Sequence, residues 1–297
     1  MGPLLTLLNV GKTFPTVVTN QFINSMARRE LTETEKTKSY AKYYYKDMAM
    51  IPENDLKGFN NGPIDPTDAL PITLRNKMME PGYHKAETGF CLMPDGSGYA
   101  ATKVFMPYVT PTMLDWWFNW HPLEGLRYAI WCPVAHASIS AETPNAHKDA
   151  SGIDLSIRNH GKSHFPEEGF NLQGAQKLRI HFRTAEDMGL DMSSFHEPNI
   201  ARLYTATVTR EIGPISFPIN IFMHCIRQTE GGVEYRSRYW LGWTIDNHRR
   251  IIRSKWHTPR NTMYHLARCN CLHSLMEYNN LASILPALYS EHQGRID

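Results

Sequence analysis

Four of the seven tryptophans in this 297-residue chain lie in one short stretch, WWFNWHPLEGLRYAIWCPVAH, which runs from Trp116 to His136. A tryptophan side chain combines a large apolar area with a single polar tip. A stretch with so many of them therefore has to be buried in a core or has to form the wall of an aromatic-binding cavity. Burial in a plain core is the commoner use of aromatic residues. The second use gains weight because the stretch ends on a histidine, His136, which is a potential metal ligand.

The bulk composition excludes several classes of partner. Apolar residues make up 42% of the chain, enough for a sizeable core, and the formal net charge is only +2. Nucleic-acid and anionic-membrane binding usually need a clustered basic excess. No window approaches the ~20 apolar residues of a transmembrane helix. We therefore expect neither nucleic acid nor a membrane to be a partner of this protein.

The cysteines and the start of the chain point to a reducing compartment. The five cysteines are odd in number, and their spacing fits no disulfide framework and no zinc-finger pattern. The apolar run at residues 4–10 lacks the basic segment and cleavage site of a signal peptide. We expect free thiols and a cytoplasmic location.

The first 80 residues are predicted to form a small, mainly helical N-terminal domain. A helical piece is expected at 21–28, and Thr32 with Glu35 has the spacing of a capping box, which predicts a helix over 36–50. That helix would carry a tyrosine- and methionine-rich face, which packs either on its own domain or against a second copy of the chain. The density of Gly, Pro and Asn over 51–71 indicates a loop and a domain boundary.

The remainder, residues 81–297, is predicted to be a larger domain dominated by antiparallel strands. The turns at 94–98 and 231–232 have hairpin chemistry. Further strand candidates are β-branched or aromatic segments separated by turn residues, at 127–132, 164–170, 177–184, 201–208, 217–225 and 235–244. A helix is expected over 112–120. A longer helix is expected from about Thr262 to Ser283, with Asn261 as N-cap and a break at Pro286.

These elements define an α+β arrangement in which a long C-terminal helix packs on an antiparallel sheet. Such a packing can leave an apolar cavity between the helix and the sheet. His273 and Glu277 are four residues apart on the predicted helix, so their side chains project from one face and both can reach one ion. This spacing is common by chance, and an exposed histidine beside a solvated glutamate is the simpler interpretation.

His136 and Glu167 are the candidates that would complete a metal site. Two imidazoles and two carboxylates suit Zn²⁺, and non-haem iron or manganese accept the same ligand types. His224 lies in an otherwise apolar strand, INIFMHC. It is either a hydrogen-bonded core residue or a general acid/base near the metal. Tyr128 and Tyr239, on neighbouring strand candidates, could donate phenol hydrogen bonds to a substrate or could simply pack.

Three separated motifs carry a family resemblance. The tryptophan-rich stretch, the upstream ETGFCLMPDGSGYA and the late HSLMEYNNLASILPALY together resemble the 2,4-diacetylphloroglucinol hydrolase family, to which phloretin hydrolase also belongs, over about Tyr83 to Tyr289. The resemblance implies an enzyme that hydrolyses the carbon–carbon bond between an acyl group and a phloroglucinol-type aromatic ring. It also implies a Bet v1-like catalytic domain, in which a curved sheet wraps the long helix around one zinc ion, and an N-terminal domain that forms a homodimer.

The resemblance also assigns residues. It implies metal ligands at His136, Glu167, His273 and Glu277, with a catalytic histidine at His224 and substrate-binding, catalytic tyrosines at Tyr128 and Tyr239. Glu168 adjoins Glu167, so that ligand could be displaced by one position. Trp116 and Trp117 are expected to bind the substrate as part of the cavity wall. Where the family has a substrate-binding asparagine after the first histidine, this chain has Ala137-Ser138-Ile139.

The expected substrate is a small aromatic polyketide or flavonoid-derived ketone such as 2,4-diacetylphloroglucinol or phloretin. Two other functions fit the same residues. One is a non-enzymatic carrier of hydrophobic aromatic ligands, since a helix-on-sheet cavity can bind such ligands without chemistry. The other is a zinc hydrolase that acts on esters or on different aryl ketones.

Overall fold

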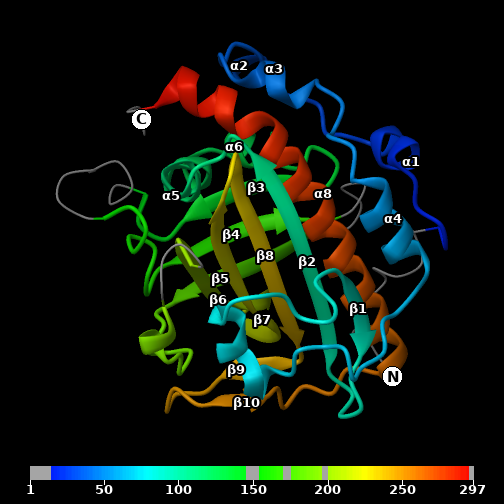
Figure 1. Cartoon of the computed structure of the whole chain (residues 1–297). Helices are drawn as coiled ribbons and strands as arrows, with labels where there is room; N and C mark the ends of the chain where they lie inside the picture. The colour runs from blue at the N-terminus through cyan, green and yellow to red at the C-terminus, as the bar shows by residue number, and fades with distance from the viewer. Residues whose placement is uncertain (1–14, 145–153, 170–174, 196–199, 294–297) are drawn as a thin grey trace.

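An eight-stranded antiparallel sheet and one long helix, α8, organise the molecule (Figure 1). The computed structural model describes residues 15–144, 154–169, 175–195 and 200–293. The strand order is β1-β2-β8-β7-β6-β5-β4-β3. The strands are β1 Gly89–Leu92, β2 Gly98–Pro107, β3 His136–Ala141, β4 Ser163–Glu168, β5 Gln176–Arg183, β6 Arg202–Ile212, β7 Ile215–Thr229 and β8 Gly232–Leu241. A separate pair is formed by β9 Trp243–Ile245 and β10 Ile251–Arg253.

The helices lie mainly on one side of this sheet. In the N-terminal part they are α1 Asn20–Ser25, α2 Glu33–Lys36, α3 Ala41–Tyr44, α4 Glu53–Asn60 and the 3₁₀ segment η2 Ile72–Met79. The tryptophan-rich stretch contributes α5 Pro111–Trp120, η3 His121–Leu123 and α6 Gly125–Ala129, and later come η5 Met192–Ser194 and α8 Arg260–His292. Among the described helices, none combines the length and apolar character needed to cross a bilayer.

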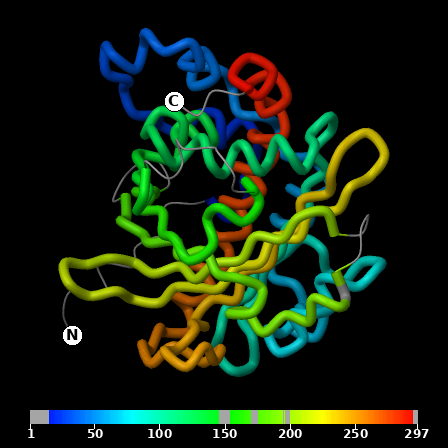
Figure 2. Tube along the Cα trace, turned by 90° about the vertical axis from the view of Figure 1, so that its left-hand side faces the viewer, coloured from blue at the N-terminus to red at the C-terminus, as the bar shows by residue number. Residues whose placement is uncertain are grey.

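The sheet is built from hairpins whose turns the sequence signals. Pro94–Gly98 connects β1 to β2, and Gly231, at a φ of 76°, closes the turn between β7 and β8. A positive φ is costly for side chains with a Cβ, which is why glycine occupies this turn. The β6–β7 hairpin reaches beyond the other strands in the turned view of Figure 2. The predicted antiparallel sheet and long C-terminal helix are confirmed.

Two hydrophobic clusters cover the two faces of the sheet. The larger one joins α8, α5 and α6 to the sheet, and it includes N-terminal residues such as Ile23, Tyr43 and Phe59. The smaller one packs η2, through Met78 and Met79, and the buried side chains of Met188, Leu190 and Ile200 against the opposite face. Figures 1 and 2 show α2 and α3 beside the last turns of α8, where Lys42 and Tyr43 both contact the carboxylate of Glu291.

Four predictions of local structure were wrong. The region 51–71, expected to be a loop, contains the helix α4 at Glu53–Asn60. The helix expected over 36–50 is replaced by two single turns, α2 and α3, although the capping box of Thr32 and Glu35 is present. Threonine and tyrosine have only modest helix propensity. The tyrosines are therefore placed by tertiary packing, with Tyr40, Tyr43 and Tyr44 buried.

The segment 127–132 is not a strand, because residues 125–129 form α6. Every residue from Leu126 to His136 is buried, so the alternation of apolar side chains did not distinguish an inner from an outer face.

Helix α8 also begins earlier than expected, after Pro259 instead of Asn261, and it continues through Pro286 to His292. The cost of an internal proline is offset by burial of the leucines on either side, Leu285 and Leu288.

A buried ion-pair cluster on the face opposite α8 holds the chain that leads into β1. The carboxylate of Glu87 accepts hydrogen bonds from Arg236 at 2.7 and 3.0 Å and from Arg238 at 2.9 Å. Both arginines are fully buried. Burial opposes ionisation of Glu87, but the two guanidinium groups outweigh burial and hold its pKa well below the usual range.

We predict that Glu87→Gln destabilises the fold by about 3–5 kcal/mol, because two buried guanidinium groups lose their counter-charge. Urea denaturation at neutral pH measures this change. Glu230→Gln, at an exposed turn position, is the matched control and should stay within about 0.5 kcal/mol of the parent chain. Equal effects of the two substitutions would contradict the structural role given to Glu87.

Candidate metal centre and substrate cavity

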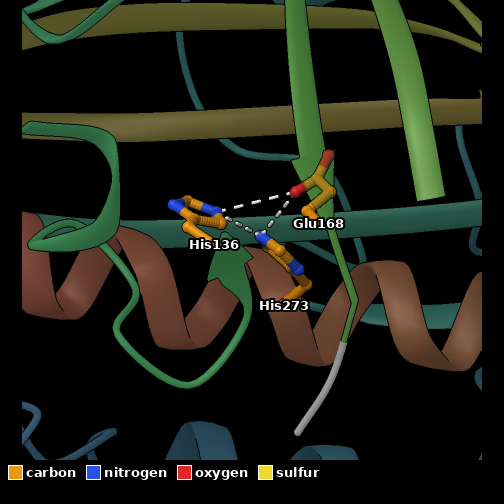
Figure 3. A group of neighbouring side chains, drawn as sticks. All are labelled: His136, Glu168 and His273. Atoms are coloured by element: carbon orange, nitrogen blue, oxygen red, sulfur yellow. Dashed lines mark hydrogen bonds and ion pairs between the residues drawn. The ribbon is translucent and has the colours of Figure 1, made fainter. Parts of the chain in front are cut away.

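Four side chains from three elements meet near the middle of α8. His136 begins β3, Glu168 ends β4, and His273 and Glu277 lie one turn apart on α8. Figure 3 shows the Nε2 atoms of His136 and His273 turned toward the Glu168 carboxylate. Glu168 Oε2 lies 3.6 Å from His136 Nε2 and 3.4 Å from His273 Nε2. Glu277 Oε2 lies 3.6 and 3.5 Å from the same two nitrogens.

The orientation of His136 is fixed by its other ring nitrogen. Nδ1 lies 3.1 Å from the backbone carbonyl oxygen of Tyr128, and because that oxygen can only accept, Nδ1 carries the hydrogen. Nε2 then presents a lone pair to the cluster, and it lies 3.0 Å from His273 Nε2. The ring also stacks on the Tyr128 ring, with centroids 3.8 Å apart and an interplanar angle of 2°. A carbonyl that orients the non-ligating nitrogen is a common feature of histidine metal ligands.

The charges of the cluster are strongly coupled. Burial lowers the pKa of His136 well below its usual value, and the nearby His273 lowers it further. Burial raises the pKa of Glu277 to about 6, with His273 opposing. Burial also disfavours charge on His273, but Glu277 and Glu168 outweigh that effect and raise its pKa to about 9.

The donor set fits a divalent cation. The ligand atoms of His136, Glu168 and His273 all lie within 4.8 Å of one another, and the carboxylate oxygen of Glu277 lies in contact with both imidazoles. Two imidazole nitrogens and two carboxylate oxygens are ligand types that zinc accepts. Two carboxylates in a buried site are unfavourable unless a positive charge compensates them. The residues present therefore fit such an ion.

The structure brings Glu168, and not Glu167, to this cluster. Successive residues of a strand point to opposite faces. Glu168 is paired with His136 in the β3–β4 ladder, whereas Glu167 is paired with Ser138 and its carboxylate accepts from the Ser138 hydroxyl at 3.4 Å. A bulge between His136 and Ser138 sets this register. The structure thus places at the cluster the glutamate one position after the expected Glu167. Ile139 belongs to the segment Ala137-Ser138-Ile139, which replaces the family's asparagine, and it lines the cavity described next.

A cavity of about 480 Å³ lies between the sheet and α8, and the cluster forms part of its wall. The strands contribute side chains of one sheet face, including Ile180, Val208, Phe222 and Tyr239. Helix α8 contributes Leu266, Asn270, His273, Glu277 and Tyr278. A mostly apolar cavity of this size with a few convergent polar groups is typical of a small-molecule site.

His224 lies in the cavity wall on β7, as a general acid/base would. Its Nδ1 is 2.9 Å from the Ser237 hydroxyl, and its Nε2 is 3.2 Å from the Tyr278 hydroxyl. Burial lowers the pKa of His224 to about 3, so the ring is neutral at physiological pH. Tyr278 and Ser237 were missed by the sequence reasoning, although Tyr278 could have been noticed because it directly follows Glu277 on the helix.

Both candidate tyrosines line the same cavity. The Tyr128 hydroxyl donates to Glu168 Oε2 at 3.1 Å, which connects it directly to the cluster. The Tyr239 hydroxyl donates to Ser274 at 3.1 Å, and Ser274 is in turn bonded to Thr102 at 2.7 Å. Burial raises the pKa of both phenols above the usual value, so both remain hydrogen-bond donors at neutral pH.

The tryptophan-rich stretch serves both the core and the cavity, but with different residues from those expected. Trp116 and Trp117 are buried in the core, where Trp116 stacks on Trp120 and Trp117 stacks on His121. Trp116 and Trp117 are not part of the cavity wall. The large aromatic side chains that this stretch does contribute to the wall include Phe118 and Trp131. The Trp131 indole donates to the backbone carbonyl of Glu277 at 3.0 Å and so also positions α8.

A buried imidazole–carboxylate cluster beside a neutral histidine, at the wall of an aromatic cavity, is the arrangement of an enzyme that acts on small aromatic molecules. Comparison with known proteins agrees with this class. Residues 70–290 match the family described as the DAPG hydrolase PhiG domain, and the chain belongs to this family of hydrolases.

The curated relatives cover most of the chain. Phloretin hydrolase from Eubacterium ramulus is 31% identical over 265 residues, which are 88% of this chain and 93% of that protein. A 2,4-diacetylphloroglucinol hydrolase from a Pseudomonas species is 28% identical over 272 residues, covering 86% and 89%. The enzyme of the same name from Pseudomonas protegens is 27% identical over 272 residues, covering 86% and 85%.

A solved structure, that of protein Ms6760 from Mycobacterium smegmatis, covers 69% of this chain and 98% of its own chain at 10% identity. The TM-score of 0.33 is too low to define a common fold. The structure itself is that of a mixed α and β protein with a large antiparallel sheet and a C-terminal helix, and the Bet v1-like class stays a prediction.

Proposed function

We propose that this protein hydrolyses the carbon–carbon bond between an acyl group and a phloroglucinol-type ring and releases a carboxylic acid. Membership of the DAPG hydrolase family supports the reaction class. The single structural observation that carries the proposal is the position of His224 and the imidazole–carboxylate cluster in the wall of one cavity. The reaction adds water across the bond, so the ring carbon gains a hydrogen and the acyl carbon gains a hydroxyl.

We further propose that His136, Glu168, His273 and Glu277 hold a zinc ion. A zinc ion bound there would supply Lewis acidity, polarising an acyl or phenol oxygen or lowering the pKa of a water molecule to ~7. Tyr128 would orient two of these ligands. Its backbone carbonyl accepts a hydrogen bond from His136, and its side-chain hydroxyl donates one to Glu168.

His224 would move the proton that the ring carbon requires. Burial keeps the ring neutral, so Nε2 would take a proton from a phenol of the substrate or from water and pass it to the ring carbon, while Nδ1 remains bonded to Ser237. The Tyr278 hydroxyl, which contacts Nε2 and lines the cavity, offers a route for that proton. Tyr128 and Tyr239 would hold ring oxygens, each by turning its hydroxyl hydrogen from its acceptor in the structure, Glu168 or Ser274, toward the substrate. A 1,3,5-trihydroxy ring assists because protonation at carbon gives a keto form, which leaves more readily than an aryl anion.

We predict that Glu168→Gln loses most of the bound zinc, because a neutral amide is a poorer ligand than a carboxylate. The matched variant Glu167→Gln should keep its zinc, since its side chain lies on the other face of β4. Elemental analysis of the purified proteins measures both. Loss of zinc from the Glu167 variant alone would reverse the assignment.

We predict that His224→Ala lowers the turnover of an acylphloroglucinol by about 10²–10⁴-fold, the usual contribution of a general acid/base. Its zinc content should be unchanged, because the hydrogen-bond partners of His224 are the hydroxyls of Ser237 and Tyr278, which lie outside the cluster. His248→Ala, at an exposed position, serves as the control. A wild-type rate in the His224 variant would remove this residue from the mechanism.

The carrier function remains the second candidate because most of the cavity wall is apolar. Metal analysis distinguishes the two functions, since a carrier of aromatic ligands has no need for stoichiometric zinc. Detection of a carboxylic acid product after incubation with an acylphloroglucinol supports the hydrolase alone.

We also propose that the protein is a cytoplasmic homodimer. All five cysteines are free and buried, which suits a reducing compartment. In the N-terminal segment assigned to dimerisation, Tyr45 and Met50 are exposed, at 60% and 74%, while Tyr40, Tyr43 and Tyr44 pack within the chain. Sedimentation at micromolar concentration should give twice the chain mass of 34.1 kDa. A species of single chain mass would contradict the dimer.

A further inference from the structure

Two asparagines in the cavity wall have polar atoms for which the described part of the chain provides no partner. Asn220 on β7 and Asn270 on α8 both line the cavity. The side-chain Oδ1 of each is buried and has no hydrogen-bond partner among the residues that the structure describes. Buried polar atoms are usually paired, and an unpaired one is unfavourable. Their place in a ligand cavity suggests that a ligand completes the pairing.

The position of Asn220 separates it from the reacting groups. It shares a row of the sheet with Val208 and Leu241, all on the cavity face. His224 is four residues further along the same strand, which corresponds to about 13 Å between the Cα atoms. A ligand that holds its reacting ring against His224 therefore presents its opposite end to Asn220.

Asn270 belongs to the face of α8 that bears the cluster. It is three residues before His273, about 4.5 Å along the helix axis, and on the same side. The helix positions that line the cavity before it, Leu266 and Cys269, are largely apolar. Asn270 thus lies between the imidazole–carboxylate cluster and the apolar end of the cavity near Leu241 and Leu266.

The chemistry of an amide limits what these residues bind. An amide offers one accepting oxygen and a donating NH₂ group, and O and N exchange places if the side chain turns over. A neutral hydroxyl, which both donates and accepts, satisfies either orientation.

We propose that Asn220 and Asn270 form a second polar subsite, which binds a hydroxyl group at the far end of the acyl arm. Resting on the proposed hydrolase function, this makes the substrate an acylphloroglucinol whose acyl arm carries a hydroxyl group at its far end. The neighbouring Leu241, Leu266 and Ile219 surround the apolar part of that arm. An arm without the hydroxyl would leave the amides unpaired and bind more weakly.

The test uses two non-hydrolysable probes, in which a methylene replaces the ketone of the acyl arm. One is 2-[3-(4-hydroxyphenyl)propyl]phloroglucinol and the other is its 3-phenylpropyl analogue without the distal hydroxyl. Titration calorimetry on the purified protein should show that the hydroxylated probe binds about tenfold more tightly, as one hydrogen bond of ordinary strength permits.

Asn220→Leu and Asn270→Leu keep the side-chain volume and remove the amide, so each should lower the affinity ratio toward one. Asn261→Leu, at an exposed position of the same helix, should leave the ratio unchanged. Equal binding of the two probes by the unmodified protein, no binding of either probe, or a ratio that survives both cavity substitutions overturns the subsite. The result for the unmodified protein decides the matter even if a variant fails to fold.

The subsite and the proposed function fail separately. If the probes show the ratio but no acylphloroglucinol is hydrolysed, the subsite stands and the hydrolase reaction falls. If ketone substrates are hydrolysed while the probes bind equally, the reaction stands and the subsite falls.

Discussion

The hydrogen bond from His136 to the backbone carbonyl of Tyr128 is the contact on which the site depends. It selects the nitrogen that faces the cluster, and it joins α6 to the first residue of β3. The bulge after His136 then allows the strand to place Glu168 opposite the imidazole. Helix α8 contributes the other two side chains and is positioned by Trp131. The geometry of the cluster follows from this small set of contacts between α6, β3, β4 and α8.

The parts of the fold that the sequence predicted are those governed by local rules. Turn glycines and alternating strands located the hairpins, and the spacing of His273 and Glu277 placed both side chains on one face of α8. The errors occurred where every side chain is buried. From Leu126 to His136 no polar face exists, so periodicity could not distinguish α6 from a strand. Glu167 and Glu168 are likewise chemically identical, and only the ladder register, set by a bulge, decides between them.

The two interpretations of the tryptophan-rich stretch are both partly correct, for a physical reason. Helix α5 is buried on nearly all sides, so its indoles cannot all face one cavity. Trp116 and Trp117 stack in the core, while Phe118 and Trp131 reach the cavity. The core residues hold rigid the segment that carries Tyr128, and therefore contribute to the site without touching a ligand. A sequence pattern locates such a stretch but does not say which of its rings is exposed to the cavity.

The long helix has a consequence for how this chain can vary in length. Asn270, His273, Glu277 and Tyr278 all reach the cavity from one uninterrupted α8. Deleting or inserting one residue within a helix rotates everything beyond that point by about 100°. Such a change between Asn270 and Tyr278 would turn part of this set away from the sheet. The turns between β6 and β7 and between β7 and β8 lie outside the cavity wall. Length differences among relatives should accordingly accumulate in those turns and be absent from the middle of the helix.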